Sequence, residues 1–417
     1  MPLEVLKAAE LNNPNSRVNP TIEIGHSGLH RYGGQINEEF LPELRGIKGV
    51  RTYDEMRKSS VGIMLSALEM PLRGTQWYVE PGGKEQADLD AAGFLETCMT
   101  DQAFPLSSFM GEVLTMLAFG WSIFEIVYKR RAGPNADPES NFDDGRIGWR
   151  KLAFRSQDSL QQWEFDDKGG LQGFVQAGVD NIAAATIPIA KLLLFRTDTE
   201  KGNPEGKSLL RNIYRSYFIK KNLEEIEAIG AERDLTGVLV ITAPANATDA
   251  DLAAARKVGE RYKVDEQAYI LNKAWGPEAH QNWKFEVLKS PGAKVVNLHE
   301  TINRYAAEIS QNFWVEFIRL GQDKAGTQAL SEELRAFFRD SAKAVLDMVE
   351  DVLNRFAVPR LFRLNDFGKL TTYPRFRHGR VGRHQLGQLS DYLLKLSQAN
   401  LLGTDPALID FVRAEAE

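Results

Sequence analysis

Two long amphipathic segments joined by a short polar one constrain the fold of this chain more than any other feature. In residues 295–320 and again in 330–356, large apolar side chains recur at steps of three or four, which is typical of a helix with one buried stripe. The first stripe comprises Leu298, Ile302, Tyr305, Ile309, Phe313 and Phe317, and the second comprises Leu330, Leu334, Phe337, Val345, Val349, Val352 and Phe356. A helix over 330–356 would be about 40 Å long, which favours a strut in an assembly over the wall of a small pocket.

Composition excludes several classes of protein. No run of 18 apolar residues occurs, so the sequence predicts no transmembrane helix, and the first ten residues do not resemble a signal peptide. Cys98 is the only cysteine, which excludes an intrachain disulfide and a cysteine-rich zinc site and fits folding in the cytosol. The net charge of −6 argues against a protein that coats nucleic acid.

Basic residues are concentrated near the C-terminus. Between residues 360 and 384 Asp366 is the only acid, against seven Lys or Arg, of which Arg375, Arg377, Arg380 and Arg383 form a candidate contact patch. Segregated charge is usually read by something outside the domain. A solvated loop, or arginines that pair with acids of a neighbouring chain, is the alternative interpretation.

The first half of the chain alternates helical and extended patterns, and we interpret it as α+β, with helices beside a small antiparallel sheet. Residues 1–50 resemble an irregular arm, residues 131–147 a surface loop, and Asp143 and Asp144 in that loop are predicted to be solvated. Helices are predicted over 52–70 (ended by Pro71), 85–103 and 106–118, and strands over 75–80, 120–129, 149–154, 163–165, 174–177 and 192–195.

A compact β-α-β-β module is predicted between two helices. A glycine-marked turn at 202–206 opens a helix over 208–233, and the module follows before the helix of 295–320. Its strands are predicted over 238–242, 268–271 and 283–288, and its helix over 249–263 with Thr248 as N-cap. The two flanking helices must therefore run antiparallel.

Several motifs follow one another in an order that resembles one known family. They are Tyr53-Asp-Glu-Met-Arg-Lys58, Trp77-Tyr-Val-Glu-Pro81, Phe119-Gly-Trp-Ser-Ile-Phe-Glu125, Gly202-Asn-Pro-Glu-Gly-Lys-Ser-Leu-Leu-Arg211 and Tyr373-Pro-Arg-Phe376. Together they resemble the Mu-like portal proteins of tailed bacteriophages, over roughly residues 45–410.

The resemblance implies a portal fold in a ring, usually of twelve subunits, at one capsid vertex. It implies that the chain divides into an arm and wing (1–207), two stem helices (208–233 and 295–320), a clip (234–294), a tunnel loop (321–329), a long helix (330–357), and a wing return with a short helical crown (358–417).

The resemblance also implies function and partners. Such a ring is the conduit for packaging and ejection of double-stranded DNA, and it docks the terminase large subunit and the head-tail adaptor beside the major capsid and scaffolding proteins. It implies a virion protein that assembles in the cytoplasm of the host bacterium, with no membrane, cofactor, metal or enzymatic activity of its own.

A ring that passes DNA should not grip it, because phosphate contacts are strong and additive. The predicted stem helix offers acids for a channel wall, namely Glu300, Glu308 and Glu316. The implied tunnel loop offers Gln322, Asp323, Lys324 and Gln328, either for weak contact with phosphates or as a flexible connector.

Two rival functions remain open. One is a phage-borne nuclease or hydrolase whose acids bind Mg²⁺, although the chain lacks the glycine-rich ATP-binding loop and a nucleophile elbow. The other is a head-completion adaptor, which would not need the helix pair and the tunnel loop together.

Overall fold

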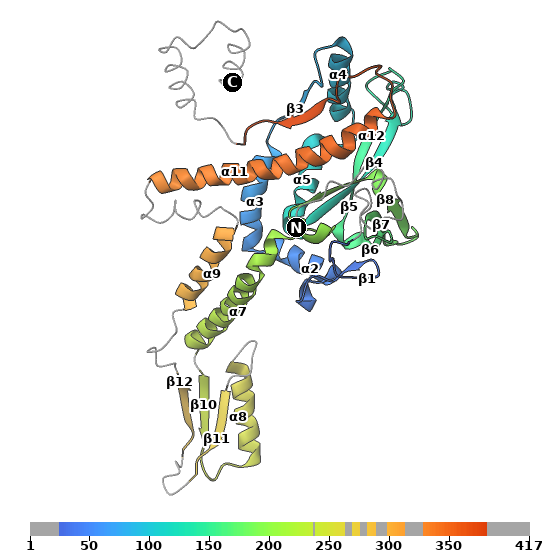
Figure 1. The fold of residues 1–417 in the computed structure, drawn as a ribbon. Coiled ribbons are helices and arrows are strands. Elements are labelled where there is room, and N and C mark those ends of the chain that lie inside the picture. Colours follow the sequence, from blue (N-terminus) through green and yellow to red (C-terminus); the bar gives the residue numbers. More distant parts are fainter. Residues whose placement is uncertain are drawn as a thin grey trace, which may run out of the picture. The chain divides into compact units, whose positions relative to one another are not determined.

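The computed structural model describes residues 25–236, 238–262, 269–275, 282–288, 298–312 and 328–381. The chain divides into two compact units: the first comprises Met1–Asn212 and Ser310–Glu417, and the second comprises Ile213–Ile309. Helices and strands are mixed, as expected for an α+β chain (Figure 1). Within the described ranges, every helix is too short or too polar to cross a membrane.

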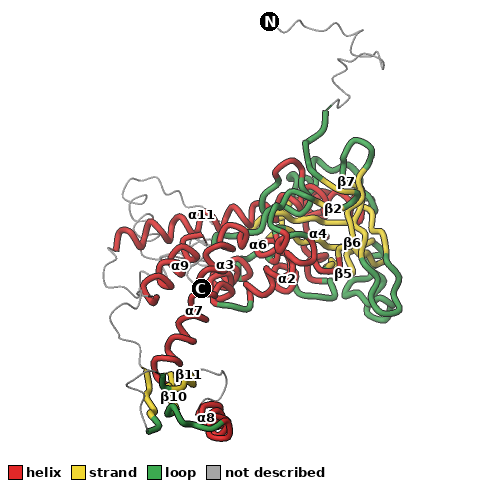
Figure 2. The backbone as a smooth tube through the Cα atoms, turned by 90° about the horizontal axis from the view of Figure 1, so that it is seen from below, coloured by secondary structure: helices red, strands yellow, loops and turns green. Residues whose placement is uncertain are grey.

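Helices of the first unit lie to one side of its strands (Figure 2). They are α2 (Gly46–Arg57), α3 (Ser60–Arg73), α4 (Gln86–Thr100), α5 (Leu106–Val113) and α6 (Thr115–Phe119). The single helix predicted over 52–70 was wrong, because the side chain of Ser59 accepts a hydrogen bond from Val61 N and caps a second helix. Pro71 does not end that helix but lies in its last turn, so it removes one backbone hydrogen bond and the helix continues only to Arg73.

Two three-stranded antiparallel sheets carry the core of the first unit. One has the order β5 (Ile147–Arg155), β4 (Trp121–Arg130), β9 (Leu192–Arg196); the other has the order β6 (Leu160–Phe165), β7 (Leu171–Gln176), β8 (Ala185–Pro188). The sequence did not predict β8. A cluster of buried side chains joins the two sheets, namely Trp121, Ile123, Trp163, Phe174, Ile187 and Leu192. Short 3-10 turns cover Pro42–Leu44, Gln157–Ser159, Ile189–Lys191 and Glu200–Gly202.

Two strand pairs bring distant or irregular segments together. β3 (Trp77–Glu80) pairs antiparallel with β13 (Arg375–His378), from almost 300 residues further along the chain. The sequence predicted β3 but not β13, whose residues had been assigned only to a basic patch. Within the predicted irregular arm, β1 (Arg31–Tyr32) pairs with β2 (Gln35–Ile36).

The long C-terminal helix is confirmed but extends at both ends. It comprises α11 (Gln328–Val352), a π-helical turn η5 (Leu353–Ala357) and α12 (Val358–Phe362). Its buried stripe includes the predicted Val345 and Val349, and also Phe338, Ala342, Leu346 and Leu353. Phe337 and Phe356 were assigned to the stripe wrongly, because they are 54% and 41% exposed. Phe356 lies within the π turn, where Leu353 and Ala357 are the buried residues.

The second unit contains the predicted β-α-β-β module. α7 (Leu209–Thr236) leads into β10 (Val238–Ala243), α8 (Asp249–Tyr262), β11 (Tyr269–Lys273) and β12 (Lys284–Leu288), and α9 (Leu298–Asn312) follows. β10 lies between β11, to which it is parallel, and β12, to which it is antiparallel. Thr248 is the N-cap, since its Oγ1 accepts from Asp251 N at 3.3 Å while the Asp251 carboxylate accepts from Thr248 N at 3.0 Å.

Candidate functional site

The motif at 202–211 builds the turn that leads into α7. Asn203 Oδ1 accepts a hydrogen bond from Glu205 N at 2.9 Å and shapes the turn locally. Ser208 Oγ accepts from Leu210 N at 3.0 Å, so it caps the helix, and its hydroxyl donates to the carbonyl of Ala118 in α6. The motif therefore anchors the start of α7 to the first unit.

Two glycines let the backbones of this turn and of β4 meet. Gly120 has φ 91° and Gly206 has φ 57°, both in the left-handed region. A Cβ atom on Gly206 would lie 2.4 Å from the Gly120 carbonyl oxygen, and one on Gly120 would lie 2.5 Å from that of Glu205. Only glycine fits at either position.

Glu205 points back into the first unit. Its Oε1 accepts a hydrogen bond from Trp163 Nε1 at 3.1 Å. Burial raises the pKa of Glu205 to about 7, and the Trp163 hydrogen bond opposes that rise only in part. The residue lines a pocket of about 430 Å³ in which Glu39 is paired with Arg211, and Glu38 with Lys201. With both of those carboxylates held by cations, the pocket resembles a structural junction more than a reaction site.

The predicted channel acids lie mainly on α9. Glu300 is exposed in its first turn. Glu308 is partly buried, and its carboxylate accepts a hydrogen bond from Ser216 Oγ of α7 at 2.8 Å. This bond places the end of α9 beside the beginning of α7 within the second unit, as an antiparallel return requires (Figure 1). Glu316 lies outside the described residues.

Only part of the predicted tunnel loop lies among the described residues. Gln322, Asp323 and Lys324 lie outside the described residues. Gln328 had been assigned to the loop, and this was wrong, because it is the first residue of α11. The helix begins two residues earlier than its apolar stripe, since polar Gln328 contributes nothing to a periodic pattern.

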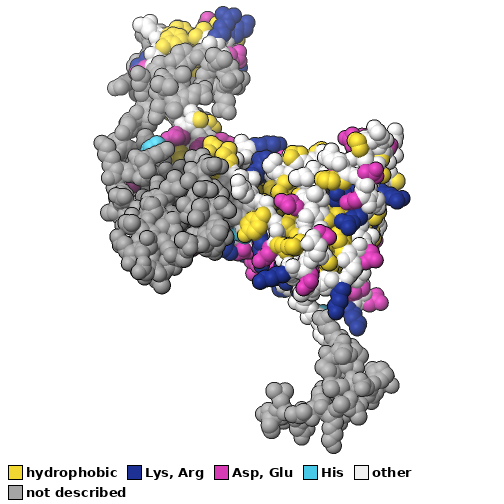
Figure 3. All heavy atoms as spheres, turned by 90° about the horizontal axis from the view of Figure 1, so that it is seen from above, with side chains coloured by type: hydrophobic (Ala, Val, Ile, Leu, Met, Phe, Trp, Pro, Cys, Tyr) yellow, Lys and Arg dark blue, Asp and Glu magenta, His cyan; other side chains and the backbone are white. Residues whose placement is uncertain are grey.

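The basic patch is partly neutralised within its own chain. The Arg377 guanidinium reaches both Glu80 and Glu350 at 2.7 Å, and these carboxylates raise its pKa. Arg375 and Arg380 are exposed, and Arg383 lies outside the described residues. Over the larger described part in Figure 3, basic side chains are interspersed with acidic and hydrophobic ones. Arg377 therefore has a structural partner that the sequence could not reveal.

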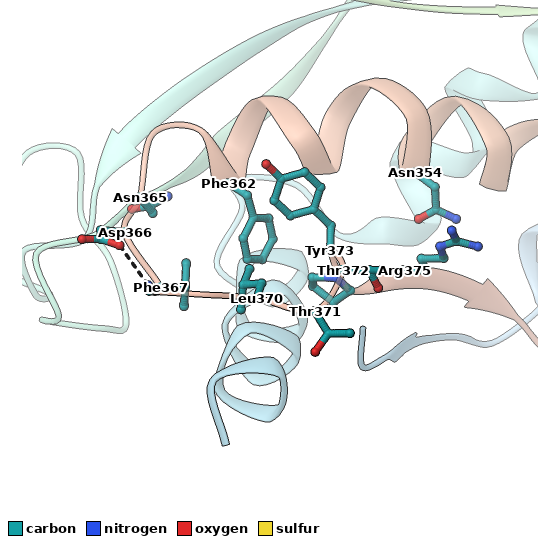
Figure 4. A pocket seen from close by; sticks show the side chains of 12 residues that line it. Asn354, Phe362, Asn365, Asp366, Phe367, Leu370, Thr371, Thr372, Tyr373 and Arg375 are labelled. Carbon is teal, nitrogen blue, oxygen red and sulfur yellow. Dashed lines mark hydrogen bonds between the residues drawn. The ribbon is translucent and has the colours of Figure 1, made fainter. Parts of the chain in front are cut away.

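A second pocket lies between α12 and the segment that follows it (Figure 4). It measures about 610 Å³, and the rings of Phe362 and Tyr373 lie 5.5 Å apart in its lining. Asn354 bonds both the N and the O of Phe376, at 2.8 and 3.0 Å, and Asp366 accepts from Gly368 N. The residues lining this pocket include no His or Cys, and its hydroxyl and carboxyl groups are those of Thr371, Thr372, Tyr373 and Asp366.

The predicted surface loop 131–147 is anchored by buried charges. Lys129 Nζ lies 3.0 Å from Asp101 Oδ2, with both side chains under 7% exposed, and Asp101 also accepts from Ser140 Oγ at 2.6 Å. Arg131, itself buried, pairs with Asp144 at 3.2 Å. The expectation that Asp144 is merely solvated was wrong, because the sequence gives no sign that Arg131 turns inward beneath it.

Comparison with known proteins identifies the family. Residues 50–414 match the family model described as the portal protein of Mu bacteriophage. The chain belongs to this family. Portal proteins are structural components of the phage particle.

Solved structures share the fold of this portal-family chain. A chain in the virion of a native gene transfer agent particle aligns with a TM-score of 0.54 and 13% identity, covering 85% of this chain and 91% of its own. A chain in the neck of an empty gene transfer agent particle, computed with C6 symmetry, aligns with a TM-score of 0.55 and 13% identity. This alignment covers 86% of this chain and 92% of the other. At this identity the likeness concerns the fold alone.

One cluster in the portal-family chain escaped sequence reasoning altogether. Asp347 and Glu350 of α11 and His378 of β13 bring ligand-type atoms within 4.8 Å of one another. The two acids stand three apart on a helix, but only the pairing of β13 with β3 brings the histidine to them. Because β13 was not predicted, no signal in the sequence could have found this cluster.

Proposed function

We propose that twelve copies of this chain form a ring at one vertex of the capsid, through which double-stranded DNA is packaged and ejected. The family match over residues 50–414 carries the proposal. The fold likeness to a chain in a particle neck computed with C6 symmetry supports it, because a ring of twelve is compatible with sixfold symmetry.

Exposed apolar side chains support self-association. On α7, Phe218, Ile226 and Ile229 are 51%, 53% and 43% exposed. Large apolar groups repeated along one helix are costly to leave in water and usually mark a contact with another chain. In a ring, the same helix of the next subunit would cover them.

The proposed DNA path runs along the α9 segment and past residues 321–329. Glu300, Glu308 and Glu316 would keep the wall from gripping phosphates, and Lys324 with Gln322 and Asp323 would make only weak contacts. Arg375, Arg380 and Arg383 are proposed to contact another component of the particle. These roles rest on the family and on charge.

We propose that the inserted module docks the terminase large subunit during packaging and the head-tail adaptor afterwards. It is a compact insertion between α7 and α9, and Trp275 beyond β11 is 97% exposed. Aromatic side chains presented in this way are typical centres of protein interfaces. The remaining surface would face the major capsid and scaffolding proteins, with assembly in the host cytoplasm.

Mass photometry and negative-stain imaging of the purified chain test the ring. We expect twelve copies of the 46.8 kDa chain, a particle of about 560 kDa with a central hole. Phe218→Asp with Ile226→Asp should leave monomers, whereas the control Ala228→Asp adds the same charge to α7 without removing a large apolar group. A wild-type chain that stays monomeric and binds a ring made by another protein would be a head-completion adaptor.

A further inference from the structure

Three metal-ligand side chains converge where β13 packs against α11. His378 Nε2 lies 3.0 Å from Asp347 Oδ1 and 4.0 Å from Glu350 Oε2. The His378 side chain is 6% exposed and that of Glu350 is 13% exposed. The Asp347 side chain is 49% exposed, so the point that the three atoms surround is shielded on the His378 and Glu350 side and open to water on the Asp347 side, at the junction of two elements far apart in the sequence.

The hydrogen bond on the other side of the ring fixes which nitrogen is free. His378 Nδ1 lies 2.8 Å from the Gly379 carbonyl oxygen, which can only accept, so Nδ1 carries the hydrogen. In a neutral imidazole, Nε2 then presents its lone pair to two carboxylates. Three acceptors that face one another need a positive charge between them, either a second ring proton or a cation.

The charged groups around the cluster leave room for a bound cation. Lys343 Nζ lies 2.9 Å from Asp347 Oδ1 and 2.7 Å from Oδ2 on the same helix, so a metal ion would displace it from Oδ1, and its side chain, 61% exposed, can turn into solvent. Arg377 occupies Glu350 Oε1 and leaves Oε2 turned toward the ring. Arg377 also pairs with Glu80, so when Lys343 moves into solvent one guanidinium remains for the three carboxylates of Glu80, Asp347 and Glu350.

We propose that Asp347, Glu350 and His378 bind a divalent transition-metal ion, best matched by zinc, which ties α11 to β13. Zinc binds His nitrogen and carboxylate oxygen at about 2.0–2.2 Å, so tetrahedral ligands lie about 3.3–3.5 Å apart. The separations of 3.0 and 4.0 Å from His378 Nε2 bracket that value, and all three atoms lie within 4.8 Å of one another, so binding would draw them together. The bond from Nδ1 to Gly379 is the kind of outer support that orients a metal-bound histidine.

Zinc titration of the full-length chain, purified without a histidine tag and stripped with a chelator, tests the site. Calorimetry at pH 7.5 should show a site at which zinc binds, and Co²⁺ should develop the absorption bands of tetrahedral coordination. Zinc should raise the thermal midpoint, and uptake should fall at pH 5.5, where protons compete for the ligands.

Variants locate the site and separate zinc from a ring proton. His378→Gln and Asp347→Asn should each weaken zinc binding by more than about 100-fold, beyond what loss of an outer partner costs. Asp351→Asn, on the exposed face one residue past Glu350, should not change it, and Lys343→Ala should keep or tighten it. Three results would overturn the proposal. The wild type takes up no zinc, zinc binding survives in both ligand variants, or both nitrogens of the His378 ring stay protonated at pH 7.5 in the presence of zinc.

Discussion

The ion pair of Asp101 and Lys129 stabilises the interior of the first unit only while both charges are present. Burial raises the pKa of Asp101, but hydrogen bonds from Ser140, Asn141 and Lys129 outweigh it and hold that pKa below its ordinary value. The stabilisation is therefore present above the ordinary carboxyl range and is lost as pH falls through the folded pKa.

Removing the cation should expose the cost of that burial. Lys129→Met should lower the free energy of unfolding by about 3–5 kcal/mol at pH 7, because Asp101 stays buried without its counter-ion. Lys191→Met, which removes a half-exposed partner of Glu125, should cost less than about 1 kcal/mol. Urea unfolding followed by tryptophan fluorescence measures the free energy of unfolding of both variants. Equal losses of stability would show that the buried ion pair contributes no more than the half-exposed one.

Glu205 should make stability depend on pH in the opposite sense. Its pKa of about 7 lies above the unfolded value, so the folded chain holds a proton that the unfolded chain releases. The stability that Glu205 contributes is fully present below about pH 4.5 and is lost as pH rises toward 7. Glu205→Gln keeps an oxygen for Trp163 and should remove this slope, so that at pH 8 the variant is more stable by up to about 3 kcal/mol.

Unfolding at pH 5, 6, 7 and 8 compares the Glu205→Gln variant with the wild type. The difference between them should grow with pH and level off above about pH 7. A difference that is the same at every pH would mean that Glu205 is charged in the folded chain throughout.

At the scale of single residues, helical spacing predicted the burial of Val345 and Val349 but not the exposure of Phe337 and Phe356, and charge partners were not predictable. Val345 and Val349 follow helical spacing, and that spacing alone decides which face is buried. Arg377 pairs with Glu80 from a strand almost 300 residues away, which no local pattern encodes. The same gap concealed His378 among the candidate ligands.

Among the elements, those with a strong period or a cap were found and the short ones were missed. Thr248 with an acid three residues on identifies the start of α8, and β10, β11 and β12 read as compact extended runs. β8 and β13 have four residues each, too few for a period to stand out. The π turn η5, which contains the misassigned Phe356, was not predicted either.

The inserted module should be separable from the first unit. Deleting 240–290 and joining α7 to the α9 segment by a short linker should leave the first unit folded, because that unit has its own core. Binding of the terminase large subunit, measured by pull-down or biolayer interferometry, should be lost. If the deletion variant binds terminase as strongly as the wild type does, the docking role is contradicted. Circular dichroism and mass photometry serve as controls, because they report whether the deletion has damaged folding or ring formation.

For the whole assembly, one lysine per subunit should influence DNA more than folding. Lys324→Ala should change the free energy of unfolding by less than about 0.5 kcal/mol, as a surface substitution does. In a ring it removes a belt of charges near the DNA, so packaged length or retention should shift in a salt-dependent way. Lys58→Ala, an exposed lysine of the first unit, serves as the control.

Complementation of a portal-deficient phage measures packaged DNA length and particle retention for both lysine variants. If the Lys324→Ala variant and a variant with Gly321 and Gly326 replaced both package DNA as the wild type does, the predicted tunnel loop is only a connector. Failure of rings to form would place that segment in a subunit interface.

The contact between Gly120 and Gly206 has an evolutionary consequence. Each glycine faces a neighbouring backbone carbonyl, so a larger residue at either position meets main chain that cannot change rotamer, unlike a side chain in a core. A mutation elsewhere could not compensate, and the two sites should tolerate no exchange even when both change together. In a saturation library selected for infectivity, these two codons should be among the least diverse of the gene, because the backbone contact alone excludes every larger residue.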